Sequence, residues 1–201
     1  MRASLPFGSR LGLAFGLTFC VLGSAASAHE KSGRYFVRVR NVIEAPGVSS
    51  GFVDEAKQLF IEELKKHPAF TLDWPADLPS DDLDALTKEL RKRKMRAFEV
   101  SLKILDAQKA IDPPPPGKQY RILTRGIKLS VFGDTLPDKV LAIGGDGESR
   151  VSTEIGKQAD VEKEGKSLMT DCTKEAVRQA VEMTLNKLDL ADKPQKVGKK
   201  K

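Results

Sequence analysis

The sequence predicts an α+β protein in which a mixed, largely antiparallel sheet carries about three helices. Two kinds of pattern indicate this fold. Segments that alternate apolar and polar residues predict strands, and segments whose apolar residues recur every three or four positions predict helices. In chain order these segments read β-α-β-α-β-β-β-α, with one more strand before the last helix if the two segments on either side of a predicted turn are counted separately. We expect the helices to pack against one face of the sheet.

The amino-terminal half opens with a strand and a helix. Residues Arg34–Ile43 alternate valine with arginine, which predicts a strand whose pattern shifts near Asn41. A helix is expected to start from an N-cap at Ser49 or Ser50, with acidic residues in its first turn, and to end near His67-Pro68. The acidic residues are Asp54 and Glu55.

A second strand, helix and strand follow. Residues Ala69–Trp74 read as a short strand, and Ser80 is expected to cap a helix that runs to about Lys94. The next segment, Met95–Asp106, alternates cleanly and predicts a half-buried strand.

Prolines and glycines divide the rest of the chain. Residues Pro113–Pro116 cannot join a strand ladder and predict a rigid loop between two strands. We expect turns at Gly133-Asp134 and at Gly144–Gly147. The strands around them are Tyr120–Phe132, Val140–Ile143 and Glu148–Ile155, and an amphipathic helix from about Ser167 to Leu190 should cover the sheet.

The first residues have the pattern of a secretory signal peptide. Arg2 and Arg10 make the start basic, and Leu11–Leu22 forms an apolar run. The small residues Ala26-Ser27-Ala28 then predict cleavage between Ala28 and His29. We therefore expect a periplasmic or secreted protein.

The predicted domains are a signal peptide (1–28), a single α+β domain (29–190) and a flexible Lys-rich tail (191–201). As a helix the apolar run rises only about 18 Å, against a hydrocarbon core of roughly 30 Å, so no transmembrane helix is expected in the mature chain. A lipid anchor at Cys20 is not expected either, because Phe19 precedes it where a lipidation site needs a small residue.

The formal net charge of +6 suggests nucleic-acid binding at first sight. Two of the arginines belong to the signal peptide, and five lysines lie in Lys193–Lys201. The rest of the chain is almost neutral, so we expect no nucleic-acid partner. Cys172 would be the one cysteine left after cleavage, and its position on the apolar face of the last predicted helix indicates a buried, inert thiol.

One motif resembles a catalytic one. Gly144-Gly145-Asp146-Gly147-Glu148 is similar to the GGDEF hairpin of diguanylate cyclases, but Gly147 interrupts the acidic pair. We interpret the segment as a tight turn in which glycine supplies a positive φ.

A metal site is a further alternative. After cleavage His29 would carry a free amino group, and with His67 it could bind copper in the manner of a histidine brace. The chain contains two histidines and neither a Gly-x-Ser-x-Gly motif nor a phosphate-binding glycine loop. We assign no catalytic, cofactor-binding or metal residues, and the sequence favours a protein that is not an enzyme.

Several stretches resemble periplasmic α/β domains of three kinds: the amino-terminal domain of TolB, the curli-secretion lipoprotein, and lipoprotein activators of penicillin-binding proteins. The resembling segments are Tyr35–Ile43, Phe52–Leu64 and Leu86–Leu102. The resemblance implies a fold more than an activity.

These observations lead to one functional expectation and two alternatives. We expect an exported, non-enzymatic envelope protein that binds another envelope protein or complex through unpaired sheet edges and loop tips, without a cofactor. One alternative is a copper-binding protein or copper enzyme that uses His29. The other is a polysaccharide-binding module, although one Trp and two Tyr offer few rings for stacking on sugars.

Overall fold

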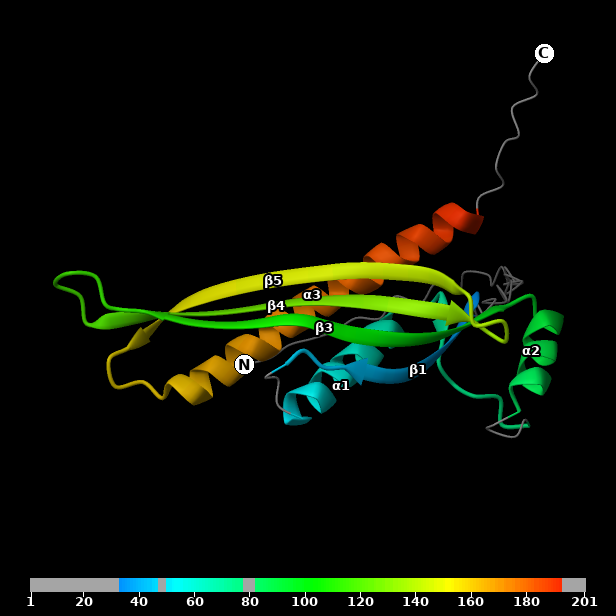
Figure 1. Cartoon of the computed structure of the whole chain (residues 1–201), viewed down its shortest axis with the longest axis horizontal. Coiled ribbons are helices and arrows are strands. Elements are labelled where there is room, and N and C mark those ends of the chain that lie inside the picture. The colour runs from blue at the N-terminus through cyan, green and yellow to red at the C-terminus, as the bar shows by residue number, and fades with distance from the viewer. Residues whose placement is uncertain (1–32, 47–49, 78–81, 193–201) are drawn as a thin grey trace, which may run out of the picture. The chain divides into compact units, whose positions relative to one another are not determined.

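The computed structural model describes residues 33–46, 50–77 and 82–192. All of them belong to one compact unit, Lys31–Lys201. The order of its elements is the predicted one (Figure 1). They are β1 (Tyr35–Ile43), α1 (Ser50–Lys66), β2 (Phe70–Thr71), α2 (Leu83–Lys92), β3 (Arg96–Asp112), β4 (Tyr120–Thr135), β5 (Leu141–Gly156) and α3 (Val161–Asp192).

The strands form one five-stranded sheet in the order β2-β1-β3-β4-β5. β1 runs parallel to both of its neighbours, and β3, β4 and β5 form an antiparallel meander. The pairing of β1 with β3 shifts register between Val39 and Val42, where the sequence pattern predicted a shift. The predicted α+β class and its mixed, largely antiparallel sheet are confirmed.

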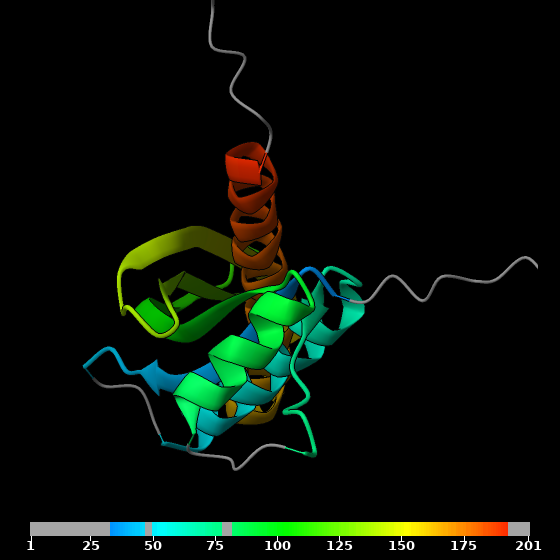
Figure 2. The same cartoon turned by 90° about the vertical axis from the view of Figure 1, so that its right-hand side faces the viewer.

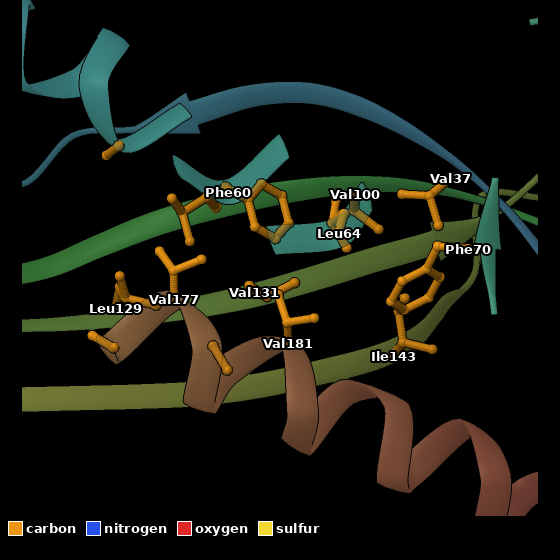
Figure 3. Close-up of a cluster of buried hydrophobic side chains, with 14 of the residues drawn as sticks. Val37, Phe60, Leu64, Phe70, Val100, Leu129, Val131, Ile143, Val177 and Val181 are labelled. Carbon is orange, nitrogen blue, oxygen red and sulfur yellow. The ribbon is translucent and has the colours of Figure 1, made fainter. Parts of the chain in front are cut away.

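Helices α1 and α3 cover one face of the sheet and enclose the main hydrophobic core (Figure 2). The strand residues in this core alternate along each strand, as the two-residue period of a strand requires. Figure 3 shows Phe60 of α1 and Val177 and Val181 of α3 among the strand side chains. The other side chains labelled there are Val37, Leu64, Phe70, Val100, Leu129, Val131 and Ile143.

The expectation that all helices pack on one face of the sheet is wrong for α2, which packs on the opposite face. Phe36 lies between Tyr35 and Val37 in β1 and therefore points to the opposite face of the sheet. There it joins Leu86 and Leu90 of α2 in a second, smaller core. Trp74 meets Phe36 edge-on, with 5.9 Å between the ring centroids.

Several boundaries differ from the prediction. The second strand contains only Phe70 and Thr71. Helix α2 has Asp82 as its N-cap, whose Oδ1 accepts a hydrogen bond from the backbone of Ala85 at 2.8 Å, whereas Ser80 lies outside the described residues. The first turn of α1 contains no acidic residue, because the helix begins at Ser50 and places Asp54 and Glu55 in its second turn.

Both predicted glycine turns in the carboxy-terminal half are wrong. Gly133 and Asp134 are paired residues of β4, and the chain reverses after them, between Thr135 and Leu141. The segment Gly144–Gly147 lies inside β5, which is one continuous strand. The predicted Pro113–Pro116 loop is confirmed, since it separates β3 from β4 at the end of the sheet opposite to α2 (Figure 1).

Helix α3 is longer than predicted. It begins at Val161 instead of near Ser167, and Oδ1 of Asp160 accepts hydrogen bonds from the backbone N–H groups of Glu162 and Lys163. The apolar periodicity is weak in this first part, which the capping aspartate stabilises. The helix ends at Asp192, two residues beyond its predicted end at Leu190.

Candidate functional site

Strand β5 forms one border of the sheet, with β4 as its neighbour on one side and no strand of the described chain on the other (Figure 1). It is 16 residues long. The other border is β2, which has only two residues and offers few backbone groups to another strand. A long border strand presents a row of backbone groups that can pair with another chain, so β5 is the border better suited to such pairing.

Two glycines let α3 lie directly on β5. A Cβ atom at Gly145 would come within 2.1 Å of the carbonyl oxygen of Ala180, and one at Gly147 within 1.8 Å of that of Ala176. Neither glycine has a positive φ, since among the described glycines this is so for Gly117 alone. These glycines are therefore required for close helix packing, and the interpretation of their segment as a turn is wrong.

This close approach brings α3 side chains to the outer border of β5. The backbone N–H of Asp146 donates to Sδ of Met183 at 3.4 Å. The backbone N–H of Glu148 donates to Oε1 of Gln179 at 3.2 Å. Both N–H groups point away from β4, so side chains of the helix satisfy donors that a neighbouring strand would otherwise meet.

A salt bridge on α3 fixes the amide of Gln179. Nε2 of Gln179 donates to Oε1 of Glu175 at 2.9 Å, which leaves its Oε1 to accept from β5. The guanidinium of Arg178 holds the same carboxylate with two hydrogen bonds, of 2.6 and 2.9 Å. The hydrogen bonds from Arg178 and Gln179 lower the pKa of Glu175 to about 2, so the network stays charged at neutral pH.

Beyond Glu148 the border of β5 is open. The alternation of the strand means that the N–H groups of Arg150, Ser152 and Glu154 also point away from β4. No side chain of the described residues accepts a hydrogen bond from these three N–H groups, and all three residues are exposed. We call the segment Arg150–Glu154 the open edge.

Hydrogen exchange tests this division of the border. We expect the amide of Glu148 to exchange more slowly than the amides of Ser152 and Glu154, because only the first is hydrogen-bonded. Gln179→Ala should accelerate exchange at Glu148 about tenfold or more and leave Ser152 unchanged, as measured by NMR. Equal protection of the three amides in the unmodified protein would contradict the assignment.

The structure leaves the predicted metal site untested, because one of its two histidines lies outside the described residues. Ala28 and His29 lie outside the described residues, as does Cys20. His67 follows the end of α1, where its Nε2 lies 3.6 Å from Oε1 of Glu63 and has no hydrogen-bond partner. The described residues contain no group of three or more His, Cys, Asp and Glu side chains that could hold a metal ion.

Cys172 is a free, fully buried thiol on the inner face of α3, as predicted. Its Sγ donates to the backbone carbonyl of Arg125 at 3.4 Å. Burial raises the pKa of this thiol, which keeps it protonated and unreactive.

The fold and its border define a class, an α+β domain with one long, partly open edge strand. No protein-family model and no curated protein matches the chain. In the described part of the chain, no helix is both long and apolar enough to cross a membrane.

Among solved structures, the chain is similar to several bacterial proteins, some of them lipoproteins. A neuraminyllactose-binding hemagglutinin homolog from Helicobacter pylori is 11% identical with a TM-score of 0.43, and the match covers 81% of this chain and 86% of that one. A minor lipoprotein from Acinetobacter baumannii is 7% identical with a TM-score of 0.39, over 76% and 92% of the two chains. The rare lipoprotein B from Shewanella oneidensis is 11% identical with a TM-score of 0.39, over 77% and 98%. Similarities this low transfer no function.

Proposed function

We propose that this chain is an exported, non-enzymatic envelope protein that binds another envelope protein by pairing with an extended segment of it along the open edge. The observation that carries the proposal is the contrast along β5. Side chains of α3 satisfy the border at Asp146 and Glu148, whereas the outward N–H groups of Arg150, Ser152 and Glu154 have no partner in the described chain. A bound strand would satisfy these donors and extend the sheet.

The signal-peptide pattern of residues 1–28 supports the location. A basic start, an apolar run too short to span a membrane and small residues before His29 direct a chain out of the cytoplasm. We place the protein in the periplasm or the extracellular space, with residues 29–190 as one binding domain and 191–201 as a tail.

The side chains of the open edge restrict which segment can pair with it. Arg150 and Glu154 carry opposite charges and lie four residues apart on the outer face of β5, which is the face that points away from α1 and α3. Opposite charges across a strand pair stabilise it, and like charges destabilise it. The expected partner segment therefore places an acidic residue opposite Arg150 and a basic residue opposite Glu154. Segments that lack this charge pattern would pair less stably with the open edge.

Site-specific photo-crosslinking in intact cells tests the proposal. We expect a photoreactive residue at Glu154 to give one dominant adduct with an envelope protein, and the same residue at Asp146 to give none. Arg150→Pro should abolish the adduct, because proline removes the outward N–H without touching the ladder to β4.

Arg150→Ala is the matched control, because it removes the charge and keeps the N–H. It should weaken the adduct without abolishing it, and thermal unfolding should show that both variants are folded. An adduct that survives Arg150→Pro, or one that forms equally at Asp146, would show that strand pairing along the open edge is not how the protein binds.

A further inference from the structure

A second feature lies on the face of the sheet that carries α1 and α3, beneath the first turns of α3 and one strand in from the open edge, since Arg125 is paired with Val151. An open cavity of about 860 Å³ is lined by residues of α1, of α3, and of the parts of β3 and β4 nearest the Pro113–Pro116 loop. Ligand pockets commonly have volumes of about 300–1,000 Å³. We call it the α1/α3 cavity. Its lining includes Phe52, Ala107, Lys109, Arg125, Glu162 and Met169.

The floor of the α1/α3 cavity contains two positive charges side by side. Lys109 of β3 and Arg125 of β4 are directly paired across the strands. They lie on the face that carries the helices, since they alternate with residues of the outer face. Like charges directly opposite each other destabilise a strand pair, so this arrangement opposes folding unless an anion compensates it.

The protein supplies only part of that compensation. Glu162 forms an ion pair with Lys109 and also attracts Arg125, and these interactions lower the pKa of its carboxyl group. The side chain of Glu162 is 79% exposed, so water weakens this pair. The second acidic group, Glu55, accepts a hydrogen bond from Thr170.

More positive charge surrounds the α1/α3 cavity. Lys163 and Lys166 line it, and neither forms an ion pair within the described residues. The cavity therefore has four cationic side chains and two carboxylates. The N-terminus of α3 is not available as an anion site, because Asp160 already accepts from its backbone.

The guanidinium of Arg125 packs against α3, and not all of its hydrogen-bond donors have a partner in the described chain. A Cβ at Gly165 would lie 2.3 Å from Nη2 and 3.0 Å from Nε of Arg125, so the guanidinium rests against the helix backbone at this glycine. Its Nε is buried and has no hydrogen-bond partner in the part of the chain that the structure describes. The described residues form no ion pair with Arg125 at contact distance, although a guanidinium can bind a carboxylate or phosphate with two hydrogen bonds.

Apolar surface lies next to these charges. Phe52 of α1, Ala107 of β3 and Met169 of α3 come from three elements and line the same α1/α3 cavity. We propose that the α1/α3 cavity binds a small anionic amphiphile, whose carboxylate or phosphate head lies on Lys109 and Arg125 and whose apolar chain lies against Phe52, Ala107 and Met169. The head would compensate the repulsion between the paired cations, and the chain would remove apolar surface from water.

Calorimetric titration of the mature protein with decanoate and decyl phosphate, below their micelle concentrations, tests this. Both should bind with one site per chain. Decyltrimethylammonium, with the same chain and the opposite charge, should not bind, and acetate and inorganic phosphate, which lack the chain, should bind at least tenfold more weakly. If only decyl phosphate binds, the head is a phosphate, and if both bind, either anion serves.

Variants locate the site. Arg125→Gln should weaken decanoate binding about tenfold or more, since a charged hydrogen-bonding partner is lost. Gly165→Ala should also weaken it, because the new methyl group displaces the guanidinium. Lys128→Gln, on the outer face of β4, is the matched control and should leave the affinity unchanged.

Two outcomes would overturn the proposal. One is equal binding of the cationic and anionic amphiphiles, which would indicate a merely apolar surface. The other is unchanged decanoate affinity in Arg125→Gln with its fold intact by circular dichroism. If an acidic peptide bound the α1/α3 cavity and decanoate did not, the ligand class would be wrong. All these measurements use the purified protein without a partner, so their outcome does not decide whether a strand pairs at the open edge.

Discussion

Gly147→Ala is expected to destabilise the protein by about 3 kcal/mol or more, the upper part of the usual range for overpacking. The added methyl group would sit 1.8 Å from the carbonyl oxygen of Ala176. Both atoms belong to regular elements, so relief requires α3 to move away from β5. Urea unfolding, followed by circular dichroism at 222 nm, measures the loss.

Gly144, three residues earlier in β5, provides the matched control. Its side chain position points to the other face of the sheet, and a Cβ there would meet its nearest atom, the carbonyl oxygen of Val131, at 3.4 Å. Gly144→Ala should change the free energy of unfolding by no more than about 0.5 kcal/mol. Equal losses for Gly144→Ala and Gly147→Ala would contradict the close packing of α3 on β5.

Phe60→Ala is expected to cost about 3–5 kcal/mol, as is usual for a buried phenylalanine. Phe60 is 0% exposed and lies between α1, α3 and the sheet (Figure 3). Truncation removes apolar contacts from three elements at once, and rigid neighbours limit collapse of the cavity. Equilibrium unfolding in urea measures this loss as well.

Phe132 is the comparison for Phe60. It belongs to β4, but it is only partly buried and lies outside both hydrophobic cores. Phe132→Ala should therefore cost about 1 kcal/mol. A loss as large as that of Phe60→Ala would mean that the outer face of the sheet is covered in solution.

The sequence predicted the order of elements because each leaves a local periodic signal. The alternation of Arg34–Ile43 even located the register shift near Asn41, which the pairing of β1 with β3 places between Val39 and Val42. The Pro113–Pro116 loop was equally predictable, since proline removes a ladder donor wherever it stands.

The main failure was the segment Gly144–Gly147. Glycine permits the backbone conformation of a tight turn, and it also makes room for the close approach of another backbone. Because the local sequence is the same in both cases, it does not distinguish them. One signal could have separated the two. Gly145 and Gly147 are two residues apart, and Ala176 and Ala180 are four residues apart in the last helix, so each pair lies on one face of its element. Two small-residue stripes of this kind predict close contact.

The residues of the two candidate sites could not be predicted from the sequence. Arg125 and Lys109 are ordinary exposed-strand residues until the β3–β4 register pairs them under α3. Gln179 is an ordinary helix residue until its amide reaches the N–H of Glu148. Contacts between residues 16 and 31 positions apart depend on register and on helix placement, which no local pattern encodes.

By itself the sequence determined the export signal pattern, the α+β class, the inert character of Cys172 and the order of strands and helices. These follow from composition and from periods of two and 3.6 residues, which neighbouring residues fix. Only the tertiary structure decided that α2 packs on the other face at one end of the sheet, that β5 is one continuous strand, and that its border is satisfied at Glu148 and open from Arg150. These depend on which backbone atoms approach each other across the fold, and glycines such as Gly147 reveal that approach only when the opposing helix is in place.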